Sequence, residues 1–218
     1  MNDLFQDMMD HEGGRETLAE GAVILRGYAR DQAPVFLAAV DAVAAVAPFR
    51  HMVTPGGFRM SVEMTNCGLL GWVSDRNGYR YAPVDPESSQ PWPALPEVFR
   101  QLASIAAAEA GFPEFTPDVC LINRYQPGTK LSLHQDRDET DLTSPIVSVS
   151  LGLPAIFLFG GLTRSAPTTR ARLAHGDVVV WGGPARLAYH AVQTIKPGHF
   201  PETGGHRINL TFRKAGPP

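Results

Sequence analysis

The sequence predicts a mainly β protein with flanking helices, in the form of a double-stranded β-helix (jelly roll). After residue 117, about eight short apolar segments follow one another, separated by turn pairs such as PG, GG and HG. The chain contains 21 Gly and 19 Pro, which suits many strands and turns better than a helical bundle. The helical patterns precede the strands as a block, so we expect helices that buttress a sandwich.

Two helices are expected before the strands. Residues 32–47 are rich in Ala and Val, with Asp31 placed as an N-cap and Pro48 ending the helix. A second helix is expected over about 95–110, where Gly111 provides a C-terminal stop. Both helices are interpreted as packing elements.

The stretch 50–92 between these helices is expected to be rich in loops. It holds short β-like pieces such as FRMSVEM and an unusual concentration of aromatic and basic residues. The strands expected after it are DVCLINRY, KLSLHQD, PIVSVSLG, AIFLFGG, RARLAH, DVVVWGG, LAYHAVQTI and HRINLTFR.

Length and composition favour one domain over residues 1–218. Hydrophobic residues make up 44% of the chain, enough for a substantial core. No repeat or linker divides the sequence, so we expect an N-terminal segment over about 1–92 and a β core with its buttressing helix over about 93–218. No oligomerisation signal stands out, and a monomer is expected.

Charge and cysteine content limit the class of protein. With 19 basic and 22 acidic residues the net charge is −3, so any contact with nucleic acid must be local. The acidic N-terminus lacks the features of a secretion signal, and no apolar run is long enough for a membrane span. We therefore expect a cytoplasmic protein without membrane contact, in which Cys67 and Cys120 stay reduced.

The sharpest chemical pattern is His134-Gln135-Asp136, followed by His190 on a later strand. Side chains alternate along a strand, so His134 and Asp136 face the same way and can hold one ion together. Two histidines and one carboxylate on one face of a metal are typical of non-haem Fe(II) oxygenases. Alone, however, this three-residue pattern is weak, and a binding module holding zinc or no metal stays open.

The C-terminal strand 206–213 adds a second signal. Arg207, Asn209, Thr211 and Arg213 share one face, and the other face is apolar. Two guanidiniums inside a β sandwich require anionic partners, because a buried unpaired charge is costly. A dicarboxylate such as 2-oxoglutarate supplies such partners through paired hydrogen bonds.

The strand 119–125 repeats this design, since Asn123 and Tyr125 face one way and offer an amide and a phenol. Either strand taken alone is equally consistent with a solvated polar face. The two strands together favour a cosubstrate pocket.

Four long motifs extend these observations. The segments NRYQPGTKLSLHQDRDE, PIVSVSLGLPAIFLFGG, HGDVVVWGG and RINLTFR resemble the bacterial AlkB family, and the resemblance runs from about residue 20 to the C-terminus. It implies a jelly-roll dioxygenase that uses Fe(II), 2-oxoglutarate and O2 to remove methyl groups from bases such as 1-methyladenine and 3-methylcytosine, releasing formaldehyde, succinate and CO2. The partners implied are alkylated single- or double-stranded DNA, with RNA as a further candidate, and the segment 1–92 would contain a nucleotide-recognition lid.

The resemblance also implies roles for individual residues. It makes His134, Asp136 and His190 the iron ligands. Arg213 would hold the distal carboxylate of 2-oxoglutarate, assisted by Asn123 and Tyr125, with Arg207 and Asn209 near the metal-side carboxylate. The extruded base would stack between Trp72 and His134, beside Met64 and Tyr79; Asp138 and Arg164 would meet its edge, and Thr54 and Ser132 would contact the nucleic-acid backbone.

Part of this interpretation depends on the resemblance alone. A base must leave the duplex to be reached, and flipped bases stack on aromatic surfaces. Trp72 and Tyr79 are also compatible with ordinary packing under a loop, and Asp138 and Arg164 with solvated charges. The loop 162–172 departs from the family pattern, and an oxygenase acting on a protein or a small molecule remains an alternative.

Overall fold

The computed structural model describes residues 13–216, so the acidic residues 1–12 and residues 217–218 lie outside the account below. The chain forms two α-helices and 14 named strands in this range. Their bounds are β1 Arg15–Ala19, β2 Ala22–Leu25, α1 Ala33–Val46, β3 Arg50–Val53, β4 Arg59–Gly68, β5 Gly71–Asp75, β6 Gly78–Ala82, α2 Glu97–Glu109, β7 Val119–Tyr125, β8 Leu131–His134, β9 Ile146–Gly152, β10 Ala155–Phe159, β11 Thr169–Leu173, β12 Val178–Trp181, β13 His190–Val192 and β14 Arg207–Arg213.

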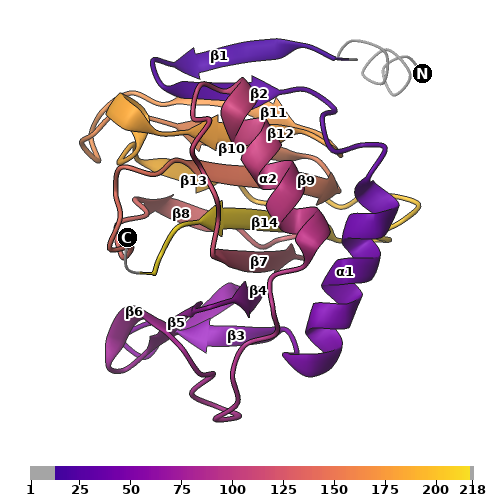
Figure 1. Ribbon diagram of the computed structural model, residues 1–218, viewed down its shortest axis with the longest axis vertical. Helices are drawn as coiled ribbons and strands as arrows, with labels where there is room; N and C mark the ends of the chain where they lie inside the picture. Colours follow the sequence, from indigo (N-terminus) through magenta and orange to yellow (C-terminus); the bar gives the residue numbers. More distant parts are fainter. Residues whose placement is uncertain (1–12, 217–218) are drawn as a thin grey trace.

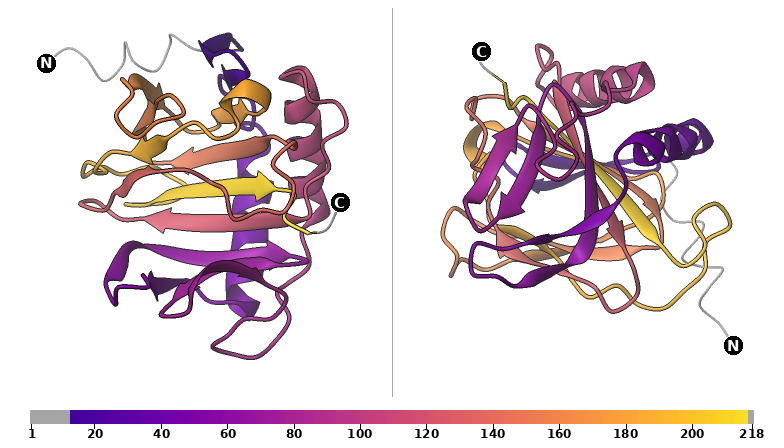
Figure 2. Two further views of the ribbon diagram at one scale, coloured as in Figure 1. Left: turned by 90° about the vertical axis from the view of Figure 1, so that its left-hand side faces the viewer. Right: turned by 90° about the horizontal axis from the view of Figure 1, so that it is seen from below.

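Two sheets pack against each other, as expected for a jelly roll (Figures 1 and 2). The large sheet has the order β1-β2-β12-β9-β14-β7-β4-β3, and the smaller one has the order β11-β10-β13-β8. Apolar side chains from both sheets form one core cluster, which includes Leu121, Phe157 and Trp181. A separate hairpin, β5–β6, lies at one end of the molecule (Figure 1).

The two helices cover the outer face of the large sheet (Figure 2). Phe36 of α1 packs on Phe99 of α2 with ring centroids 5.0 Å apart, and Phe99 meets Phe212 of β14 at 5.8 Å. This second core explains why Ile208, Leu210 and Phe212, on one face of β14, are apolar. The helices therefore act as the expected buttress.

The start of α1 corrects one expectation. Gln32 occupies the N-cap position and no side-chain cap hydrogen bond forms, so Asp31 is not the cap. Pro34 lies in the first turn and has no N–H to satisfy, which lowers the need for a capping side chain. Helix α2 lies within its expected range, and Gly111 follows it with φ +102°.

The N-terminal part contains more strand than the sequence indicated. The stretch 50–92 was expected to be rich in loops with short β-like pieces such as FRMSVEM; that piece belongs to β4, which is longer than expected, with ten residues paired along β7. Strands β1 and β2 were not anticipated at all. Because β1 to β4 join the large sheet, the expected boundary near residue 92 falls within a continuous sheet.

Cys67 and Cys120 are register partners on β4 and β7, and both are buried free thiols. They contribute to the core beneath the helices. Within residues 13–216, no helix combines the length and apolar character needed to cross a membrane.

Candidate metal centre and active site

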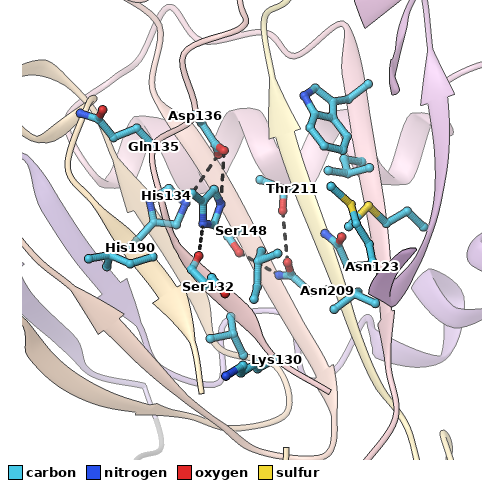
Figure 3. Close-up of a pocket in the computed structure, with 18 of the residues that line it drawn as sticks. Asn123, Lys130, Ser132, His134, Gln135, Asp136, Ser148, His190, Asn209 and Thr211 are labelled. Atoms are coloured by element: carbon cyan, nitrogen blue, oxygen red, sulfur yellow. Dashed lines mark hydrogen bonds and ion pairs between the residues drawn. The ribbon is translucent and has the colours of Figure 1, made fainter. Parts of the chain in front are cut away.

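His134, Asp136 and His190 form a compact cluster inside the sandwich (Figure 3). One ligand atom from each residue lies within 4.8 Å of the others. The two histidines are register partners on β8 and β13, which brings their rings to a centroid distance of 4.4 Å. Strand β8 ends at His134, so Asp136 reaches the cluster from the segment that follows.

Hydrogen bonds to the backbone orient both imidazoles. Nδ1 of His134 lies 2.8 Å from the carbonyl oxygen of Ser132, and Nδ1 of His190 lies 3.0 Å from that of Ala188. A carbonyl only accepts, so each Nδ1 carries the proton and each Nε2 is left with a free lone pair. The Nε2 atoms lie 3.6 and 3.7 Å from the Asp136 carboxylate, as two ligands of a shared ion would.

The protonation states of His190 and Asp136 favour cation binding by this cluster. Burial lowers the pKa of His190 to about 4, so that this imidazole is neutral at physiological pH. Burial by itself would raise the pKa of Asp136, but Arg213 and the two histidines outweigh it and hold that pKa well below its ordinary range. The site thus presents two imidazoles and one carboxylate, the donor set of non-haem Fe(II) centres.

A cavity of about 580 Å³ opens beside this cluster. One wall consists of polar side chains from β7, β14 and β9, and strand register explains how they meet. Arg207 is paired with Tyr125, and Asn209 with Asn123, across β14 and β7. On the other side of β14, Asn209 donates to Ser148 Oγ at 2.8 Å (Figure 3).

Several buried polar atoms around the cavity have no hydrogen-bond partner within residues 13–216. They belong to one amide, one phenol, two guanidiniums and one indole, and they are Asn123 Oδ1, Tyr125 Oη, Arg207 Nε and Nη1, Arg213 Nη1 and Trp181 Nε1. Such atoms are costly unless a guest satisfies them. Burial raises the pKa of Tyr125 to about 12, so its hydroxyl remains a donor. Five unpartnered donor atoms converging on one cavity fit an anion such as a dicarboxylate, so the residues present suit 2-oxoglutarate.

The two arginines of β14 have different surroundings. Arg213 Nη2 lies 2.6 Å from Asp136 Oδ2, which places this guanidinium beside the metal ligands. Arg207 lies six residues away along the strand, where it donates to Ser150 Oγ at 2.9 Å and lies 5.2 Å from the Tyr125 ring centroid. This order is the reverse of the one the resemblance implied, which had placed Arg207 near the metal-side carboxylate.

Aromatic residues of the β5–β6 hairpin form the outer rim of the cavity. The rings of Trp72 and Tyr79 stack at 5.7 Å with an interplanar angle of 12°. Trp72 Nε1 donates to Asp138 Oδ2 at 2.8 Å, and Met64 lies in the wall beneath as the register partner of Asn123. Tyr79 is 48% exposed, which leaves an aromatic surface open to an incoming group.

The remaining candidates line the same cavity. Arg164 lies over the Tyr189 ring at 5.5 Å, in the turn between β10 and β11. Thr54 accepts a hydrogen bond from the Phe58 backbone at 3.1 Å, and Ser132 is exposed beside His134. All the candidate residues from the sequence therefore border one cavity.

Sequence reasoning missed a buried ionic cluster behind the metal ligands. Glu139 accepts a hydrogen bond from Tyr81 at 2.8 Å on Oε1 and one from Arg186 at 3.0 Å on Oε2, and Arg213 Nε approaches Oε1 at 3.1 Å. Arg186 also donates to the backbone carbonyl of Asp136 at 2.7 Å. Nothing in the local sequence marks these residues, because they come from separate loops and strands.

Ser148 and Ser150 were also missed, although a signal was available. They alternate with Val147 and Val149 in a strand that is buried throughout, which places two hydroxyls on one face. That face is the cavity wall, where each serine contacts a β14 side chain.

Residues 21–213 match the 2OG-Fe(II) oxygenase superfamily. The chain belongs to this superfamily, in agreement with its jelly-roll fold, its cluster of two histidines and one carboxylate, and its cavity lined by hydrogen-bond donors.

Within the superfamily, the sequence is similar to proteins that share the AlkB name. It is 59% identical to the alpha-ketoglutarate-dependent dioxygenase AlkB of Escherichia coli over 99% of both chains. It is 49% identical to the AlkB homolog of Caulobacter vibrioides, covering 81% of this chain and 79% of that protein. The solved structure of OsALKBH1 superposes with a TM-score of 0.81 at 30% identity, over 92% of this chain and all of the other.

Proposed function

We propose that this protein is an Fe(II)- and 2-oxoglutarate-dependent dioxygenase that removes methyl groups from alkylated nucleic-acid bases such as 1-methyladenine and 3-methylcytosine. The observation that carries this proposal is a single cavity that joins a two-histidine, one-carboxylate cluster to an anion-binding wall and an aromatic rim. The identity to AlkB proteins, 59% over 99% of the chain and 49% over 81% of it, supports the same activity.

His134, Asp136 and His190 would hold the iron. For the cosubstrate, we exchange the roles that the resemblance gave to the two arginines. Arg213 beside Asp136 would hold the metal-side carboxylate, and Arg207 would hold the distal one. Tyr125 and Asn123 would assist, with Asn209 completing the wall.

When bound, iron, 2-oxoglutarate and O2 supply the oxidation of the methyl carbon, and the methyl group leaves as formaldehyde alongside succinate and CO2. The protein's own task is placement. The backbone carbonyls of Ser132 and Ala188 fix the imidazole tautomers, and the β14 wall fixes the cosubstrate. The apolar lining, which includes Phe157 and Trp181, limits water beside the reacting carbon.

The lesion would enter between Trp72 and His134, with Met64 and Tyr79 beside it. A base methylated at its pairing edge is cationic, and the Asp138 carboxylate on the rim would stabilise that charge. We place Arg164 at the base edge and Thr54 and Ser132 at the nucleic-acid backbone.

The finer assignments are also proposals. We infer that the protein acts as a monomer on DNA, single- or double-stranded, with RNA as a second substrate, and that it works in the cytoplasm. The two buried free thiols are compatible with a reducing compartment. The nucleotide-recognition lid would consist of the β5–β6 hairpin and the adjoining β3–β4 turn.

The decisive experiment measures succinate formation with and without oligonucleotides carrying 1-methyladenine or 3-methylcytosine. We expect the methylated oligonucleotides to stimulate succinate formation and to lose their methyl groups as formaldehyde. Turnover of 2-oxoglutarate without any stimulation would reject the nucleic-acid substrate and favour a protein or small-molecule substrate. No turnover with Fe(II) and O2 present would reject the oxygenase assignment itself.

A further inference from the structure

The hairpin β5–β6 carries two aromatic donors that point to the same side. Trp72 and Tyr81 are direct register partners in this antiparallel pair, so their side chains lie on one face. Each ends in a single polar hydrogen, the indole N–H and the phenol O–H. The hairpin therefore offers two donors, side by side, to whatever lies beneath it.

Two consecutive carboxylates accept these donors. Trp72 Nε1 lies 2.8 Å from Asp138 Oδ2, and Tyr81 Oη lies 2.8 Å from Glu139 Oε1. Both acceptors belong to the segment that follows β8 and begins with the metal ligand Asp136. Hydrogen bonds to charged acceptors are stronger than neutral ones, so two of them attach the hairpin firmly at this point.

The backbone of Trp72 is fixed as well. The side-chain amide of Asn66 on β4 accepts from Trp72 N and donates to Trp72 O, each at 3.0 Å. Asn66 is 1% exposed and its amide pairs with the peptide as a neighbouring strand would. Trp72 is thus held at its backbone by the large sheet and at its indole by the metal-ligand segment.

Glu139 connects the hairpin to the metal ligands. Arg213 lies between the two carboxylates, with Nε 3.1 Å from Glu139 Oε1 and Nη2 2.6 Å from Asp136 Oδ2. Arg186 braces the same segment through Glu139 and the Asp136 carbonyl. A continuous set of polar contacts therefore runs from the Tyr81 hydroxyl to the carboxylate of Asp136.

We propose that Tyr81 is a positioning residue for substrate: together with the Trp72 indole it latches the β5–β6 hairpin onto residues 136–139. The latch sets the separation between the stacking face of Trp72 and the metal ligands, and it holds the Asp138 carboxylate at the rim. Tyr81 itself does not contact the base. This inference rests on the proposed function, because it assigns Trp72 the task of stacking a flipped base.

The test uses Tyr81→Phe, which removes one hydroxyl and keeps the ring. In the holoenzyme loaded anaerobically with Fe(II) and 2-oxoglutarate, amide hydrogen exchange is measured over residues 71–82. We expect exchange there to rise about tenfold, as for loss of a hydrogen bond to a charged group, while β9 and β14 stay protected. The Kd for a 1-methyladenine oligonucleotide should rise by about the same factor, with 2-oxoglutarate affinity unchanged.

Tyr28→Phe is the matched control. The Tyr28 hydroxyl donates to Glu109 at 2.7 Å, a bond of the same type outside the cavity, so its loss should change neither hairpin exchange nor oligonucleotide affinity. Trp72→Phe removes the second donor while keeping an aromatic ring beside Tyr79, and it should loosen the hairpin as Tyr81→Phe does. If Tyr81→Phe also lowers protection in β9 and β14, the substitution has disturbed the whole sandwich. In that case the exchange of residues 71–82 in Trp72→Phe decides whether the hairpin is latched.

Two results would overturn the latch: unchanged exchange over 71–82, or faster exchange with an unchanged Kd. Failure of the proposed function looks different. In that case the wild-type holoenzyme would bind methylated and unmethylated oligonucleotides equally, and the exchange data alone would decide whether the hairpin is latched.

Discussion

Arg213 and Asp136 form a buried ion pair in the floor of the cavity, with Nη2 2.6 Å from Oδ2. The carboxylate that ligates the metal is therefore also the partner of a guanidinium on the C-terminal strand. Asp136 raises the pKa of Arg213 against the opposing effect of burial, so the guanidinium stays charged. The metal cluster and the cosubstrate wall are thus joined by this ion pair.

Replacement of Asp136 with Ala should abolish turnover and weaken iron binding, because the cluster loses its only anionic ligand. Iron content after dialysis and formaldehyde release measure the two effects. Asp138→Asn is the control for iron, since Asp138 lies in the same segment but outside the cluster. Full activity in Asp136→Ala would refute the ligand assignment.

Replacement of Arg207 with Met should raise the KM for 2-oxoglutarate by roughly 10- to 100-fold, the loss expected for a charge-assisted pair of hydrogen bonds. The KM for methylated oligonucleotide should stay within about twofold, because Arg207 lies at the cosubstrate wall and not at the rim. Arg172→Met, an exposed arginine of β11, controls for the loss of one positive charge. A larger effect on the oligonucleotide than on 2-oxoglutarate would contradict this placement.

The same two arginines should differ in their effect on stability when metal and cosubstrate are absent. Arg213→Met leaves the Asp136 and Glu139 carboxylates facing each other in a buried site, which should cost about 3–5 kcal/mol. Arg207→Met removes a buried charge whose Nε and Nη1 have no partner, so its effect should be near zero or stabilising. Urea unfolding of both variants tests the contrast, and equal losses would disprove it.

Asp138→Asn should slow repair of cationic lesions more than repair of neutral ones. The asparagine oxygen can still accept from Trp72, so the substitution removes charge and keeps the contact. We expect about a tenfold loss in kcat/KM on 1-methyladenine and a smaller loss on a neutral etheno adduct. Parallel rate measurements on the two oligonucleotides provide the comparison, and equal losses would remove the charge from the explanation.

The free energy of unfolding should decrease as the pH is lowered, because His175 becomes protonated. This residue lies outside the cavity. Its Nδ1 accepts from Gly152 N at 3.0 Å, and its ring stacks on Phe200 at 4.3 Å, so the folded chain requires the neutral form. Burial lowers its pKa below the unfolded value of about 6.5, and the unfolded chain therefore binds the proton first. This contribution is complete above about pH 6.5 and is lost as the pH falls below it.

Urea unfolding of wild type and His175→Gln between pH 7.5 and 5 tests that sign. The wild type should lose stability more steeply than the variant on acidification. A parallel pH dependence in the two proteins would show that His175 contributes nothing.

Strand alternation predicted which side chains share a strand face. Arg207 and Asn209 lie on one face of β14 as expected, and the structure adds their register partners, Tyr125 and Asn123 of β7. The apolar face of β14 packs under the helices, with Phe212 against Phe99. The alternation of polar and apolar side chains depends only on neighbouring residues of one strand, so it can be recognised in the sequence.

What the sequence did not predict depends on contacts between distant segments. The partner of Arg213 is set by the segment after β8, and Glu139 gains its partners from β6, β14 and the loop after β12. The β-like piece FRMSVEM lies at the start of β4, but the strand continues to Gly68 through the polar residues Thr65 and Asn66. Asn66 has a structural task there, because its side-chain amide holds the backbone of Trp72.

Strand β14 cannot change its length by one residue. A single insertion between Arg207 and Arg213 would turn every following side chain of the strand to the opposite face. Arg213 would then enter the apolar layer under the helices, and Phe212 would enter the cavity. Cosubstrate recognition and helix packing would fail in the same event. A change of length in the connection between Val192 and His206, which lies outside the named strands, would leave the two faces of β14 as they are.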